Sequence, residues 1–141
     1  SIDEKELKVL EDITKWMNIN SECIFETRPW QIYGEGPTAE NANPINAQGF
    51  NEGKGGPYTA EDIRFTKKGD VLYVMVMELP VKCQEVIIKS LSTNSQYYSE
   101  KFDEVEMLGG TIISYKFDKE GLSIALPDRM DLIAPIAFKI Q

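Results

Sequence analysis

The 141-residue sequence contains no histidine, and only two cysteines, Cys23 and Cys83. Histidine is the commonest general base and the commonest metal ligand, so its absence argues against the usual acid–base and metal sites. The two cysteines lie too far apart for a Cys-x-x-Cys motif, which excludes the usual zinc and dithiol-redox interpretations. The sequence is compatible with a disulfide between the two cysteines and with two free thiols. We expect two unpaired, buried thiols.

Long apolar runs are also missing. No stretch approaches the ~20 residues that a membrane-spanning helix requires, and the polar, acidic N-terminus shows no secretory signal. The net charge is −8, which repels phosphate groups. We therefore expect neither nucleic acid nor an anionic membrane surface as a partner.

Motifs for nucleophilic catalysis and phosphate binding are absent as well. The chain has no Gly-x-Ser-x-Gly, and the glycines of residues 34–38 and 53–56 do not form a phosphate-binding loop. A glycosidase needs two carboxylates about 5 to 9.5 Å apart, one of them with a raised pKa. Glu26 and Glu35 are the two acids that merit consideration, and we expect both to be solvated. The residues themselves predict no catalytic group, metal or cofactor.

Residues 1–17 carry a helical pattern. Asp3 is the expected N-cap, Glu6 completes a capping box, and Ile2 and Leu7 are spaced as a hydrophobic staple. The residues at 18–21 end the helix. Its single apolar face, which requires a packing partner, consists of Leu7, Val9, Leu10, Ile13, Trp16 and Met17.

After this helix the pattern changes twice. Residues 34–57 are rich in glycine and proline, which predicts a long loop. From Tyr58 onward, alternating apolar residues predict short antiparallel strands, with a central strand at 71–77 and a hairpin over 113–126. The fold class is therefore mainly β, an antiparallel β-sandwich preceded by one amphipathic helix. The seven expected strands lie near residues 63–66, 71–77, 86–91, 104–107, 113–117, 122–126 and 136–140.

The candidate binding residues are Arg28, Trp30 and Tyr98. Trp30 follows a short strand-like run at residues 23–25, and a tryptophan can stack on a sugar while an arginine binds its hydroxyls. Tyr98 and Tyr97 form a second aromatic pair. The alternative, which we favour, is that Trp30 anchors the chain in an interdomain crevice and Arg28 pairs with a neighbouring acid.

Four stretches resemble the C-terminal third of glycoside hydrolase family 29 α-L-fucosidases. LEDITKWMNINSECIF (10–25) resembles the helix and turn that end the catalytic barrel, and ETRPWQIYGEGPT (26–38) resembles the exit segment. YTAEDIRFTKKGDVLYVMVMELP (58–80) resembles the first strands of the trailing sandwich, and GLSIALP (121–127) with AFKI (137–140) resembles its end. Single departures from the family's usual residues occur at Ser21, Cys23, Phe25 and Glu26.

The resemblance implies a retaining hydrolase that removes terminal α-L-fucose from glycans. The family's nucleophile and acid/base belong to the barrel and have no match here, so this chain alone is expected to be inactive. Residues 1–33 would then be the last helix and exit segment of a truncated catalytic barrel. Residues 34–57 would be a long linker loop rich in glycine and proline, and residues 58–141 would form the C-terminal β-sandwich. Trp30 would sit at the joint, more exposed here than in the parent enzyme. The alternative function is a carbohydrate-binding module.

The resemblance also implies partners and a compartment. The expected partner is the missing catalytic barrel, with glycans and self-association through the unpaired helix as further expectations. Relatives of this kind are secreted, periplasmic or lysosomal, and the same is expected of this chain.

Overall fold

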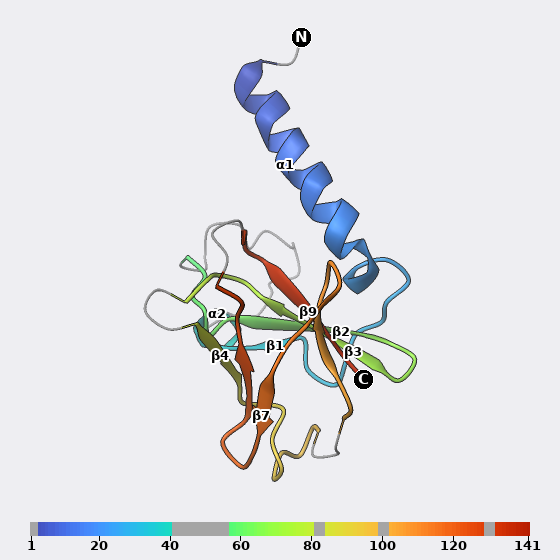
Figure 1. Cartoon of the computed structure of the whole chain (residues 1–141), viewed down its shortest axis with the longest axis vertical. Helices are drawn as coiled ribbons and strands as arrows, with labels where there is room; N and C mark the ends of the chain where they lie inside the picture. Colours follow the sequence, from blue (N-terminus) through green and yellow to red (C-terminus); the bar gives the residue numbers. More distant parts are fainter. Residues whose placement is uncertain (1–2, 41–56, 81–83, 99–101, 129–131) are drawn as a thin grey trace, which may run out of the picture.

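One long helix projects from a body made of two β-sheets (Figure 1). The structure, a computed structural model, describes residues 3–40, 57–80, 84–98, 102–128 and 132–141. All strand pairs in both sheets are antiparallel. The fold class expected from the sequence, an antiparallel β-sandwich with one helix, is confirmed.

The projecting helix, α1 (Glu4–Asn20), begins where the capping pattern places it. The Asp3 carboxylate accepts a hydrogen bond from the Glu6 N–H at 2.8 Å. Ile2, which is expected to form a hydrophobic staple with Leu7, lies outside the described residues. The helix runs three residues beyond the expected end, and the Asn20 side-chain amide donates to the Trp16 carbonyl at 3.1 Å.

A short 3-10 helix, η1 (Ser21–Cys23), follows α1. The expected strand-like run at residues 23–25 is therefore wrong. The Ser21 carbonyl accepts hydrogen bonds from the N–H groups of both Ile24 and Phe25, at 3.0 and 2.9 Å. These local bonds close turns and leave no backbone groups in register for a neighbouring strand.

The larger sheet has six strands within the described residues, in the order β1-β2-β3-β9-β5-β6. The smaller sheet has three, in the order β4-β8-β7. All seven predicted strands are present, β3 lies centrally between β2 and β9, and β7 and β8 form the predicted hairpin. The strands are β1 (Gly34–Glu35), β2 (Ile63–Lys68), β3 (Val71–Val76), β4 (Glu85–Ile88), β5 (Val105–Met107), β6 (Thr111–Ile112), β7 (Tyr115–Phe117), β8 (Leu122–Ala125) and β9 (Ile136–Ile140).

The segment expected to be a loop from residue 34 onward begins with regular structure. β1 pairs with β2, and a single helical turn, α2 (Pro37–Glu40), follows it. Glycine is needed because the chain passes so close to β2: a Cβ on Gly34 would collide with the Ile63 carbonyl oxygen. Gly36 has a φ of +105° and lies against the Glu61 carbonyl. Residues 41–56 of the predicted loop lie outside the described residues.

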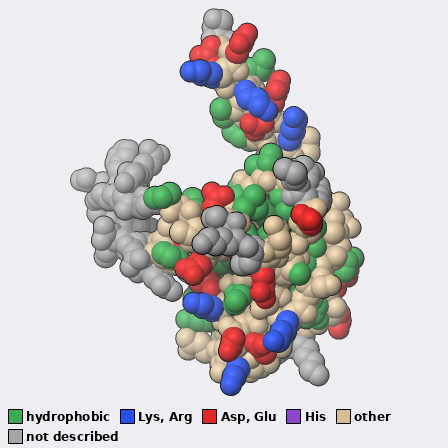
Figure 2. Space-filling view, turned by 60° about the vertical axis from the view of Figure 1, so that its left-hand side comes forward, with side chains coloured by type: hydrophobic (Ala, Val, Ile, Leu, Met, Phe, Trp, Pro, Cys, Tyr) green, Lys and Arg blue, Asp and Glu red, His purple; other side chains and the backbone are tan. Residues whose placement is uncertain are grey.

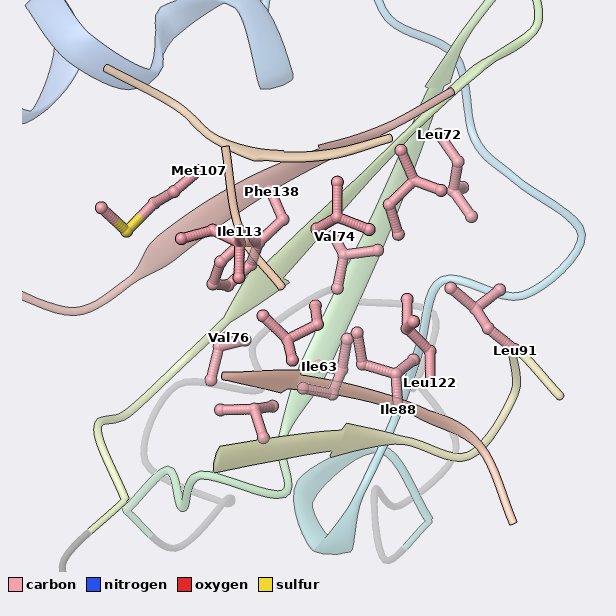
Figure 3. Close-up of a cluster of buried hydrophobic side chains, with 14 of the residues drawn as sticks. Ile63, Leu72, Val74, Val76, Ile88, Leu91, Met107, Ile113, Leu122 and Phe138 are labelled. Atoms are coloured by element: carbon pink, nitrogen blue, oxygen red, sulfur yellow. The ribbon is translucent and has the colours of Figure 1, made fainter. Parts of the chain in front are cut away.

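The hydrophobic core fills the space between the two sheets (Figure 3). Side chains from β2, β3 and β9 of the larger sheet meet side chains from β4 and β8 of the smaller one. This inter-sheet packing is what the alternating pattern of the sequence requires. Its fully buried members include Ile63, Val74, Val76, Ile88, Leu91, Val105, Leu122, Ile124 and Phe138.

A second, smaller cluster holds the base of α1 on the larger sheet. Trp16 packs there and donates from its indole Nε1 to the Pro135 carbonyl at 2.6 Å. The Glu22 carboxylate accepts a hydrogen bond from the Tyr73 hydroxyl at 2.9 Å and lies 3.4 Å from the Lys139 ammonium. The buried residues of this cluster are Cys23, Tyr73, Met75, Leu108 and Ala137.

Cys23 is a free, fully buried cysteine, and Cys83 lies outside the described residues. Burial raises the pKa of the Cys23 thiol to about 11. We expect its alkylation at pH 8 to be suppressed in the folded chain, because only the thiolate reacts and the raised pKa lowers its fraction roughly 100-fold. Peptide mapping after iodoacetamide treatment, with and without denaturant, separates Cys23 from Cys83. Equal rates at Cys23 in both conditions would contradict the buried site.

Candidate functional site

An open pocket of about 460 Å³ forms where three segments of the chain meet. One wall consists of Trp30 and Gln31, a second of the β2–β3 turn and its flanks, and a third of the loop at 95–98. Two of the three candidate residues, Trp30 and Tyr98, line this pocket. Arg28 does not.

Trp30 is positioned by backbone pairing just upstream. The Arg28 N–H donates to the Lys67 carbonyl at 2.7 Å, and the Lys67 N–H donates back at 2.8 Å. This antiparallel bridge lays the segment along β2, so the Trp30 ring packs on Phe65 with 4.9 Å between centroids. Trp30 is half-buried and contacts the sandwich core.

The pairing also determines what Trp30 contacts within the chain. Trp30 packs into the sandwich itself, whereas the tryptophan that joins α1 to the sheet is Trp16. The Arg28 side chain is exposed and forms no ion pair with another described residue, so the expected pairing with an acid is not seen. Contact of Arg28, Trp30 or Tyr98 with sugar stays a prediction.

Hydrogen bonds hold the third wall in place. The Ser95 hydroxyl donates to the Ser90 carbonyl at 2.6 Å and accepts from the N–H groups of Tyr97 and Tyr98 at 3.0 and 3.3 Å. The Gln31 amide Nε2 donates to the Tyr97 carbonyl at 2.9 Å. Two walls of the pocket are thereby connected, and the Tyr97 ring lies 6.3 Å from the Trp30 ring, edge to face.

The two acids singled out from the sequence have separate structural roles. The Glu35 carboxylate accepts the N–H groups of Lys89 and Ser90 at 2.9 and 2.8 Å. Glu26 is exposed, has a φ of +59°, and lies 3.8 Å from the Lys68 ammonium. Asp70 is the one carboxylate among the described residues that line the pocket. Glycoside hydrolysis uses two facing carboxylates, and the described lining of this pocket provides one.

A separate polar cluster fastens the chain on both sides of residues 41–56. Asp62 is fully buried, and one carboxylate oxygen accepts the Thr38 N–H and hydroxyl at 2.8 and 2.6 Å. The other oxygen accepts the Thr59 N–H and hydroxyl at 2.7 and 3.1 Å. Burial opposes ionisation of Asp62, but these hydrogen bonds outweigh it and lower the pKa of the carboxyl.

Arg64 completes this cluster. Its guanidinium donates to the Thr38 hydroxyl at 2.7 Å and lies 5.4 and 5.6 Å from the ring centroids of Tyr33 and Tyr58. The cluster is satisfied by its own members, so its role is structural. Among the described residues, no group of three potential metal ligands gathers, and no helix has the length and apolarity to cross a membrane.

The sequence predicted the aromatic pocket residues but missed the polar ones. Gln31, Lys67, Asp70 and Gln96 come from three separate segments, and none belongs to a motif. The fold brings them together, chiefly through the bridge that places Trp30 beside the β2–β3 turn.

Comparison with known proteins agrees with this architecture. The elements define a class, an antiparallel β-sandwich domain with one projecting N-terminal helix. A family model described as the alpha-L-fucosidase C-terminal domain matches residues 57–141. The chain belongs to this family. A comparison with curated protein sequences found no match.

Solved structures show the same fold. The crystal structure of Thermotoga maritima alpha-fucosidase matches with a TM-score of 0.64 and 17% identity, covering 100% of this chain and 28% of that one. Its complex with fucose gives the same values. A structure named alpha-L-fucosidase matches with a TM-score of 0.61 and 18% identity, over 100% of this chain and 26% of that one. The chain thus spans about a quarter of the length of these proteins.

Proposed function

We propose that this chain is the non-catalytic C-terminal portion of a retaining α-L-fucosidase that releases terminal α-L-fucose from glycans. Its role is to carry the last helix of the catalytic barrel and to support the barrel from one side. The observation that carries the proposal is the exposed apolar face of α1.

The outer part of α1 has no packing partner in the described structure. Figure 1 shows the helix extending away from the sheets, and Figure 2 shows hydrophobic side chains along it among charged ones. Four apolar residues of this face leave about half of their surface exposed, from 48% to 56%: Leu7, Val9, Leu10 and Ile13. Such a stripe normally packs against another element. A barrel in the longer fucosidases is the partner that the family resemblance provides.

The catalytic carboxylates are assigned to the partner. A retaining glycosidase holds two carboxyl groups about 5 to 5.5 Å apart. The pocket beside Trp30 is lined by one acid, Asp70. On the family resemblance, we assign the nucleophile and the acid/base to the barrel, and stability and positioning to this chain.

An activity assay with an aryl α-L-fucoside tests the proposal. We expect no turnover by the purified chain, and restored stability or activity when a separately produced barrel of the parent enzyme is added. Turnover by the chain alone that a point mutation abolishes would contradict the non-catalytic role. A stable barrel that does not associate with the chain would contradict the supporting role.

The proposal includes the compartment that the resemblance implies, which is secreted, periplasmic or lysosomal. Fractionation of cells that produce the parent protein tests this part. Concentration-dependent dimers of the isolated chain, measured by sedimentation velocity, would reveal self-association through the same helix.

A further inference from the structure

We propose that the pocket between Trp30, the β2–β3 turn and the loop at 95–98 binds a neutral sugar residue of a glycan. The inference does not depend on the catalytic partner. The ligand class follows from what the three walls offer.

The aromatic walls provide two surfaces at an angle to each other. The rings of Trp30 and Tyr97 are inclined by 61°, and both residues are partly exposed and line the pocket. Phe65 supports Trp30 from the core side. A pyranose ring has an apolar face of C–H groups that packs well on such a ring, while its hydroxyls point outward to polar neighbours.

The polar groups match hydroxyls better than they match a charged ligand. The Gln31 amide uses its Nε2 on the Tyr97 carbonyl, which leaves Oε1 as an acceptor, and the exposed Gln96 amide both donates and accepts. Lys67 and Asp70 contribute one charge of each sign, and neither forms an ion pair with another described residue. Asp70 and the net charge of −8 would repel an anionic ligand. Lys67 would repel a cationic ligand.

The site is formed before any ligand arrives. The Ser95 hydroxyl and the Gln31 amide fix the loop, so little ordering is required on binding. The volume of about 460 Å³ falls within the ~300 to 1,000 Å³ that small-molecule sites span. Because the pocket is open, we expect it to hold the end of a glycan weakly.

The walls of the pocket differ in their distance from α1. The loop at 95–98 lies at the end of the body opposite α1 (Figure 1). The β2–β3 wall includes Val71, which packs on the same cluster as Trp16 at the base of the helix.

Titration of the isotope-labelled chain, followed by NMR, tests the inference with a panel of L-fucose, other neutral monosaccharides and fucosylated oligosaccharides. We expect saturable shifts at residues 30–31, 67–72 and 95–98, with a Kd near ~1 mM for the best sugar. Gln96→Ala and Tyr97→Ala should each weaken binding at least fivefold. Gln84→Ala, an exposed glutamine outside the pocket, is the matched control and should leave Kd unchanged.

The outcomes separate clearly. No shifts at ~10 mM of any sugar, shifts outside the pocket, or equal binding by the Gln96→Ala and Tyr97→Ala variants would overturn the inference. Preferential binding of short peptides in a parallel titration would also overturn it. Gln96→Ala changes an exposed side chain, so it stays informative even where Tyr97→Ala alters folding. None of these results depends on fucosidase activity or on association with a barrel.

Discussion

Replacing Asp62 by alanine is expected to lower the free energy of unfolding by about 3 kcal/mol, because hydrogen bonds to a buried carboxylate are stronger than neutral ones. The carboxylate accepts four hydrogen bonds, two from Thr38 and two from Thr59. Its removal leaves two backbone N–H groups and two hydroxyls without their acceptor in a part-buried site. The loss also frees the chain on both sides of residues 41–56.

Urea unfolding at pH 7, followed by tryptophan fluorescence, measures this loss. Asp103→Ala serves as the matched control, because Asp103 is exposed and should change stability by less than about 0.5 kcal/mol. Equal stability of the Asp62→Ala and Asp103→Ala variants would show that the Thr38 and Thr59 donors find other partners.

The lowered pKa of Asp62 predicts the pH dependence of the same effect. An aspartate in an unfolded chain titrates near ~3.9, and the folded carboxyl titrates below that value. Its contribution to stability is therefore complete above about pH 4 to 5 and is lost as the pH falls through the lowered pKa. The stability difference between the wild type and Asp62→Asn should accordingly shrink at about pH 3.

The parts of the fold that the sequence predicts are those with local signals. Asp3 and Glu6 specify the start of α1, and the alternation after Tyr58 specifies the longer strands. β1 and β6 have two residues each, too few for a visible alternation. The glycines at 34 and 36 indicated a loop, yet they are there because the backbone passes so close to β2 and to the Glu61 carbonyl.

The candidate site shows the same division between local and tertiary information. Trp30 and Tyr98 are predicted as candidate binding residues from residue type alone. Their distinct roles come from packing, since Trp30 rests on Phe65 and Tyr98 contacts Phe102 with 6.0 Å between ring centroids. No spacing in the sequence brings Gln31 to the Tyr97 carbonyl, because that contact spans 66 residues of chain.

The largest functional effect is expected from the double substitution Leu10→Glu with Ile13→Glu on α1. Both side chains are about half exposed, so the stability of the isolated chain should change by less than about 0.5 kcal/mol. Association with the catalytic barrel should weaken at least 100-fold. Burial of each such side chain contributes about 1.5 to 3 kcal/mol, and every 1.4 kcal/mol corresponds to about a factor of ten in affinity.

Lys15→Glu is the matched control for this pair. It changes the net charge by the same two units, but Lys15 lies on the polar side of the helix, opposite the apolar face. Titration calorimetry of each variant against the separately produced barrel distinguishes the two causes. An equal loss in both variants would mean that charge alone governs association, and no loss in the double variant would remove the helix from the interface. A loss confined to the double variant would show that the exposed stripe of α1 belongs to a core shared with the barrel, held in position by Trp16 and the Glu22 contacts at its base.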